Sequence, residues 1–147
     1  MALTLTVALF IGACAEGTVS SARFVDSVSG VRVEYMLTAT HAFLGEYDRR
    51  LRVEFARSRV DYAMEKDSGG LLLLNIHRLP EGRLMLYDGS AHIIIDAERE
   101  TVVHTNPPAD AAAAEYVGCF DSPRGDGFRF IPSSERPEQK PPLAGTR

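Results

Sequence analysis

His77 and His92 are the residues whose chemistry first suggests a site in this chain of 147 residues. Both fall on one face of a four-strand meander that the pattern of residues 71–105 predicts. The short turns of the meander place one strand between the strand of His77 and the strand of His92, so these two strands lie about 10 Å apart. Imidazole nitrogens bind zinc at about 2.0–2.1 Å, and this separation is too wide for a shared ion. We therefore expect structural or exposed histidines, no metal and no cofactor.

Nucleophilic chemistry has no better setting in the sequence. The serines lack a G-x-S-x-G context, and Cys119 has no base that the sequence can place beside it. We interpret Cys119 as a small buried hydrophobic residue. The loop 121–127 contains two aspartates but not the spacing of a calcium-binding loop. We predict that the protein is not an enzyme, with a small hydrolase using His41 or His77 as an alternative.

The meander is defined by its turns. Pro80-Glu81-Gly82 ends a strand over 71–79, Gly89-Ser90 follows a strand over 83–88, and a four-residue loop separates strands over 91–96 and 101–105. Turn length fixes the register of an antiparallel hairpin. The sequence thus predicts these opposed pairs: His77 and Met85, Tyr87 and His92, Asp96 and Thr101.

This register divides the meander into two faces, because opposed residues share a face. The aliphatic face carries Leu72, Leu74, Ile76, Leu84, Leu86, Ala91, Ile93, Ile95 and Val102, and should form the core. The other face is mixed, and its polar members are the candidate binding face: Asn75, His77, Arg83, Tyr87, His92 and Asp96.

Further strands are predicted by alternation of apolar and polar residues over 31–37, 50–55 and 60–64. Residues 40–48 fit a loop or a single helical turn, and 109–115 could form two helical turns. Residues 116–120 and 128–131 predict a closing hairpin. The five arginines from Arg49 to Arg59 interleave with core positions, and Glu46, Asp48, Glu54 and Asp61 can neutralise them as a solvated face.

These elements predict an all-β fold with minor α content: an antiparallel meander curled into a half-barrel or an open sandwich. We expect a single β domain over 22–132. Residues 133–147 contain three prolines and mixed charge, and predict a disordered or loosely packed tail. A formal charge of −4 argues against a nucleic-acid partner, and no apolar run approaches the roughly 20 residues of a membrane-spanning helix.

The N-terminal segment is apolar from Leu3 to Ala13 and ends in Ile11-Gly12-Ala13-Cys14. This ending resembles the lipobox of bacterial lipoprotein precursors, although residues 1–13 contain no Lys or Arg. The resemblance implies a signal peptide over 1–13, acylation of Cys14 and a tether over 14–21. Two alternatives remain: a buried first strand, since the apolar residues alternate, and a disulfide between Cys14 and Cys119.

Together these features predict an exported, non-catalytic protein of the bacterial cell envelope, anchored by lipid and facing the periplasm. The candidate binding face would take an unidentified envelope protein or small ligand. A second hypothesis is a carrier that holds an apolar ligand, such as a lipid, in a cavity under the sheet.

Overall fold

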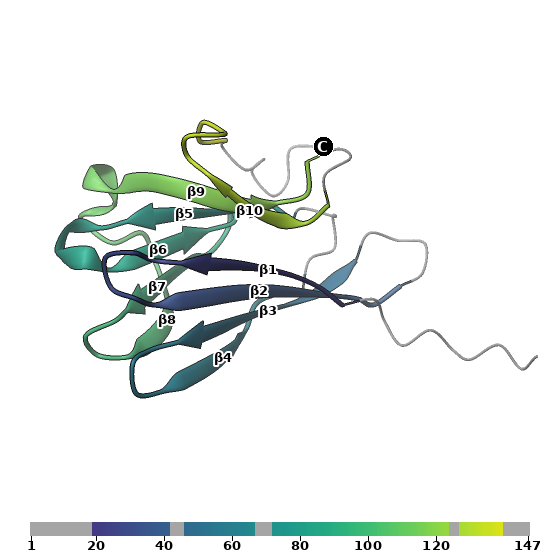
Figure 1. Ribbon diagram of the computed structural model, residues 1–147, viewed down its shortest axis with the longest axis horizontal. Coiled ribbons are helices and arrows are strands. Elements are labelled where there is room, and N and C mark those ends of the chain that lie inside the picture. The colour runs from purple at the N-terminus through teal and green to yellow at the C-terminus, as the bar shows by residue number, and fades with distance from the viewer. Residues whose placement is uncertain (1–18, 42–45, 67–71, 124–126, 140–147) are drawn as a thin grey trace, which may run out of the picture.

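The computed structural model describes residues 19–41, 46–66, 72–123 and 127–139, and they form two antiparallel sheets (Figure 1). The four-stranded sheet has the order β1-β2-β3-β4, with β1 (Val19–Val25), β2 (Arg32–Ala39), β3 (Tyr47–Glu54) and β4 (Arg59–Ala63). The six-stranded sheet has the order β10-β9-β5-β6-β7-β8, with β5 (Leu74–Arg78), β6 (Leu84–Tyr87), β7 (His92–Asp96), β8 (Thr101–Thr105), β9 (Glu115–Asp121) and β10 (Arg129–Pro132).

The four strands of the meander, β5 to β8, form as the turns predict. His77 pairs with Met85, Tyr87 with His92, and Asp96 with Thr101. A short 3-10 helix, η1 (Pro80–Gly82), forms the first turn, where Glu81 adopts a positive φ of 70°. The predicted register is confirmed because each short hairpin connection permits few pairings.

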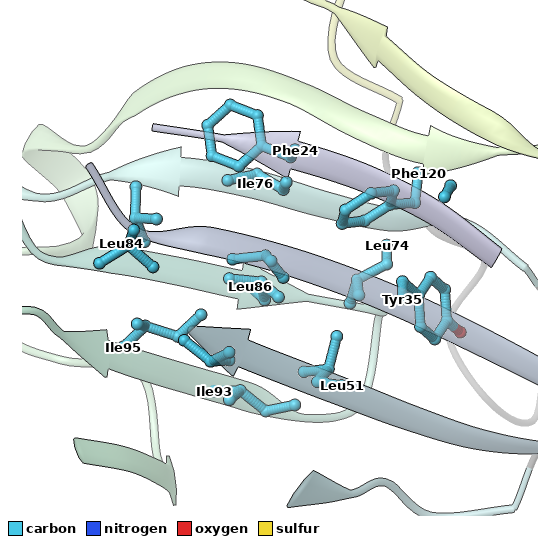
Figure 2. Close-up of a cluster of buried hydrophobic side chains, with 14 of the residues drawn as sticks. Phe24, Tyr35, Leu51, Leu74, Ile76, Leu84, Leu86, Ile93, Ile95 and Phe120 are labelled. Atoms are coloured by element: carbon cyan, nitrogen blue, oxygen red, sulfur yellow. The ribbon is translucent and has the colours of Figure 1, made fainter. Parts of the chain in front are cut away.

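The core lies between the two sheets, and both contribute to it (Figure 2). Alternate residues of each strand point inward, so the predicted aliphatic face of β5 to β7 meets an equivalent face of β2 and β3. The buried cluster includes Phe24, Tyr35, Leu51, Leu74, Ile76, Leu84, Leu86, Ile93, Ile95 and Phe120. Two apolar sheet faces packed together define a β-sandwich.

The sheets lie close along both edges without closing into a barrel. At one edge β1 lies beside β10, and the rings of Phe24 and Phe130 are 4.7 Å apart. At the other edge β4 lies beside β8. The all-β prediction is confirmed, and of its two forms the structure adopts the open sandwich.

Two ion pairs, each with a buried aspartate, connect the sheets near their opposite ends. Near the β1–β2 turn, Asp26 is fully buried and accepts a hydrogen bond from Arg78 of β5. Toward the other end, Arg49 of β3 donates to Asp88, which follows β6, at 2.9 Å. Each pair joins an element of the four-stranded sheet to one of the six-stranded sheet.

Two features differ from the sequence expectations. The strand β1 begins at Val19, within residues expected to form the tether, and the alternation analysis did not detect it. Arg49 was expected on a solvated face, but its side chain is only 7% exposed. This expectation was wrong because Arg49 shares the inward parity of Leu51 and Val53, and Asp88 neutralises it within the sandwich.

Several expectations concern residues outside the described ranges. These include the signal peptide, the lipobox cysteine and most of the tether, and the middle of the 40–48 segment. Within the described ranges the structure contains no helix with the length and hydrophobicity needed to cross a lipid bilayer.

Candidate functional site

The outer face of the six-stranded sheet turns away from the core and contains the predicted binding face. Its members are not equally accessible: Asn75, His77 and Asp96 are buried, whereas Arg83, Tyr87 and His92 are partly exposed. Two segments cross this face: one covers an apolar cluster, and the other covers Asn75 and His77. The accessible site is therefore smaller than the sequence predicts.

The first covering segment connects β8 to β9. It contains the short 3-10 helix η2 (Ala111–Ala113), and Ala111 and Ala114 pack against an outer cluster of Leu79, Met85 and Ile94. The sequence suggested up to two helical turns over 109–115, whereas the structure forms a single three-residue 3-10 turn. The cluster shows that this region of the outer face is a small second core.

The second covering segment consists of residues 133–139, which we call the C-terminal strap. The side-chain amide of Asn75 donates to the carbonyl oxygen of Gln139 at 2.8 Å. The Nε2 atom of His77 lies 3.0 Å from a carboxylate oxygen of Glu138. The strap thus makes one backbone contact and one side-chain contact with the polar floor of the outer face.

The start of the strap is fixed to β9. The backbone N–H of Ser133 donates to the carbonyl of Val117 at 2.9 Å, which continues the pairing of β10 with β9. The guanidinium of Arg136 forms an ion pair with Asp121. These contacts hold the strap across β9 and direct its last residues over β5.

Two polar side chains beneath the strap retain unused hydrogen-bonding capacity. Asn75 is fully buried and His77 is 7% exposed. The Oδ1 atom of Asn75 and the Nδ1 atom of His77 have no hydrogen-bond partner among the described residues. Burying polar atoms without partners costs stability, so an apolar pair would serve folding better at these positions.

Tyr116 and Cys119 of β9 complete the floor. The ring of Tyr116 lies 5.5 Å from the ring of His77, and its hydroxyl faces the thiol of Cys119. Burial raises the pKa of both the Tyr116 hydroxyl and the Cys119 thiol. A buried, protonated thiol is a poor nucleophile, and Cys119 occupies the buried position that the sequence predicts.

The accessible centre of the outer face is an aromatic pair. The rings of Tyr87 and His92 stack with their centroids 4.4 Å apart and their planes 21° apart. Burial lowers the pKa of His92, and the nearby Asp88 carboxylate opposes this shift. A neutral imidazole stacked on a phenol offers a flat, partly exposed surface that can contact a partner.

Arg83 and Asp96 lie at the edge of the outer face, beside a hollow of about 320 Å³ that also borders the β1–β2 turn. Arg83 donates to Asp110 at 2.9 Å. Asp96 accepts from the backbone N–H groups of Glu98 and Arg99, so its carboxylate stabilises its own turn. This contact makes Asp96 a structural residue.

A second hollow, of about 350 Å³, lies over the outer side of the four-stranded sheet. Arg23, Arg52 and Arg32 line it, and each forms an ion pair with Glu34 or Glu54. Of these arginines only Arg52 belongs to the set that the sequence predicts on a solvated face, and the pairs leave little net charge to recognise a ligand.

The described residues contain no group of three or more histidine, cysteine or acidic side chains that could hold a metal ion. His77 and His92 lie on strands separated by β6, in agreement with the predicted register. His41 is exposed and follows the end of β2.

The fold and this face define the chain as an antiparallel β-sandwich of ten described strands with a partly covered outer face. Comparison of the chain with protein-family models, curated proteins and solved structures gives no match.

Proposed function

We propose that the protein is a non-catalytic binding protein, exported and held at a bacterial envelope membrane through Cys14, and that its outer face binds an extended acidic segment of a partner protein. The observation that carries the proposal is the polar floor formed by Asn75 and His77. These side chains bind the C-terminal strap while each retains a buried atom without a partner among the described residues.

The contacts of the strap support a peptide as the bound group. A side-chain amide that donates to a backbone carbonyl recognises extended chain of any sequence, as Asn75 does with Gln139. An imidazole beside a carboxylate favours an acidic residue, as His77 does with Glu138. An acidic partner segment could displace the strap and make equivalent contacts on the same floor.

The aromatic pair supports an extension of this site. Tyr87 and His92 lie on β6 and β7, which continue the sheet from the floor on β5. Aromatic side chains contribute large contact areas to protein interfaces at low entropic cost. Residues of the partner beyond the acidic segment would contact this pair.

The apolar-carrier hypothesis gains no support from the fold. The aliphatic face of the meander packs against the four-stranded sheet, and its central residues Leu74, Ile76 and Leu86 are fully buried. A carrier would line such a face with space for its ligand.

A labelled synthetic peptide with the sequence of residues 133–139 tests the binding function by fluorescence anisotropy. In the full-length protein the strap competes at a high effective concentration, so binding should be weak. Glu138→Lys removes the carboxylate that contacts His77 and weakens the strap. We expect about 5-fold to 10-fold tighter binding of the peptide, which corresponds to about 1–1.4 kcal/mol.

Matched controls locate the effect on the floor. Adding His77→Gln to the Glu138→Lys variant should weaken peptide binding, whereas adding the exposed Arg59→Ala should not. A second peptide with Lys at the position of Glu138 should bind less well. Equal affinity for the two peptides, or no binding to Glu138→Lys at millimolar concentrations, would refute the proposal.

The membrane anchor has a separate test. Cells that express the wild-type chain or Cys14→Ser are grown with radiolabelled palmitate, and the protein is isolated. Labelling of the wild type alone is the expected result, because the Cys14 thiol is the proposed site of lipid attachment. Equal labelling of both proteins would exclude Cys14 as that site.

A further inference from the structure

We propose that two copies of the chain associate through β8, whose free edges pair antiparallel and join two six-stranded sheets into one continuous sheet. This inference is independent of the peptide-binding function. It rests on the exposure of the β8 edge, its chemistry and its self-complementary sequence.

In the described structure no strand pairs with the outer edge of β8, although β4 of the other sheet lies near it. β8 is the last strand of the six-stranded sheet and pairs with β7 on one side only. Thr101, Val103 and His104 are exposed, and Val103 is 49% exposed although it is a large hydrophobic residue. An open edge presents backbone N–H and C=O groups that another strand can bind.

The chemistry of β8 lacks the usual protection against pairing. Proteins block edge strands with charged residues, prolines or bulges. Thr101–Thr105 contains no charged residue or proline, and its register with β7 is continuous. The neighbouring edge strand β4 carries the charged pair of Arg59 and Asp61, and at the opposite edge β1 lies beside β10.

The sequence of β8 favours a second copy as the occupant. A two-fold axis at Val103 places Val103 opposite Val103 of the second copy, and Thr101 opposite its Thr105. Threonine pairs and pairs of β-branched residues are favourable across antiparallel strands. The side chains on the outer face of β8 are Thr101, Val103 and Thr105, an order that is the same in both chain directions. Two antiparallel copies of β8 therefore present matching residues to each other.

The flanking residues permit this register. Glu100 would lie opposite Asn106 of the second copy, and Arg57 already neutralises Glu100 in the monomer. Pro107 and Pro108 follow β8 and limit the paired length. A pair of five-residue strands buries less area than a standard stable interface, so the dimer should form at micromolar or higher concentrations.

Sedimentation velocity of the full-length protein tests the association over concentrations from about 1 µM to about 1 mM, the range of weak interfaces. We expect a dimer fraction that rises with concentration, and loss of the dimer in Val103→Lys because two ammonium groups would meet at the axis. The control Val28→Lys changes another exposed valine, 66% exposed in the β1–β2 turn, and should dimerise as the wild type does. A wild-type protein that stays monomeric throughout, or equal behaviour of the two variants, would overturn the proposal.

Cysteine cross-linking tests the register itself. In a Cys14→Ser background, Val103→Cys should form an intermolecular disulfide under mild oxidation, because opposed Cα atoms lie about 4.5–5.5 Å apart. Thr101→Cys should cross-link far less, because its own counterpart would lie four residues along the partner strand. Equal cross-linking of the two variants would exclude a two-fold axis at Val103.

Discussion

Arg49 shows how one side chain joins two sheets. Its guanidinium donates to Asp88 at 2.9 Å and to the carbonyl of Glu65 at 2.8 Å, and both members of the ion pair are almost fully buried. Desolvation makes such a pair costly to break, because the remaining charge stays buried without its partner. The pair therefore fixes the relative position of β3 and β6.

We predict that Arg49→Ala lowers the free energy of unfolding by about 3–5 kcal/mol, the usual effect of removing one member of a buried ion pair. Urea unfolding followed by circular dichroism measures this change. The control Arg59→Ala removes an exposed ion pair and should change the stability by less than about 1 kcal/mol. Equal effects of the two substitutions would contradict the structural role of Arg49.

The two buried aspartates predict acid sensitivity. Burial opposes ionisation of Asp26, but hydrogen bonds from Ser29 and Arg78 outweigh it and hold the pKa of Asp26 below its ordinary value of 3.8. Burial also opposes ionisation of Asp88, and backbone donors together with Arg49 again lower its pKa. Both carboxylates thus ionise more readily in the folded state than in the unfolded chain.

A lowered folded-state pKa stabilises the fold fully above the unfolded value near 3.8, and this stabilisation is lost as the pH falls below that value. We predict that the urea midpoint decreases as the pH falls below about 4. Asp26→Asn should be less stable at neutral pH and should lose less stability on acidification. If the urea midpoint of Asp26→Asn changed with pH as steeply as that of the wild type, Asp26 would not contribute to the acid sensitivity.

At the scale of elements, the meander was accessible to prediction because its information is local. Turn length set the register, and alternation assigned Leu74, Ile76 and Leu86 to the core. The strand β1 was missed because its first residues are small and polar, and pairing with β2 stabilises it. Local pattern cannot report a strand that depends on its neighbour.

The coverage of the outer face could not be predicted for a related reason. Residues 133–139 contain proline and charged residues, a composition typical of solvated chain, yet Glu138 and Gln139 contact residues more than 60 positions earlier. The inward position of Arg49 was available from its parity with Leu51, but its partner Asp88 was not. The burial of Asn75 and His77 within the predicted face depends on these distant contacts.

Gly118 of β9 lies opposite Pro132 of β10, so a larger side chain at this position tests how closely the two strands must pack. An added Cβ would lie 2.4 Å from the carbonyl oxygen of Ile131 and 2.7 Å from the ring of Phe130, and Gly118 has a φ of +154°. We expect Gly118→Ala to displace β10 and lower the free energy of unfolding by about 3 kcal/mol. The comparison is Gly82→Ala, where a Cβ meets no atom within 4 Å at a φ of +78° and backbone strain costs about 1 kcal/mol.

Chemical denaturation measures both glycine variants, and the NMR signals of β10 report its position. If Gly118→Ala lowered the free energy of unfolding no more than Gly82→Ala does, β10 would be able to move away from β9 without loss of stability.

For the whole molecule, the shared core predicts cooperative unfolding. Leu86 and Tyr35 come from different sheets and belong to one buried cluster. We predict that tyrosine fluorescence and far-ultraviolet circular dichroism give coincident urea transitions. Leu86→Ala should shift both transitions together and cost about 2–5 kcal/mol. Separate transitions would mean that one sheet is stable without the other.

Under the proposed acylation of Cys14, the start of β1 at Val19 limits how far the sandwich can lie from the membrane. An extended chain from Cys14 to Val19 spans at most about 18 Å, so an acylated Cys14 would keep the sandwich against the bilayer surface. In the proposed β8 dimer, a two-fold axis perpendicular to the paired sheets relates the two copies. The lipid on Cys14 of each copy can then enter the same bilayer only when this two-fold axis is parallel to the membrane normal. The sandwich would then lie flat on the membrane, with the outer face of one of its two sheets toward the lipid headgroups.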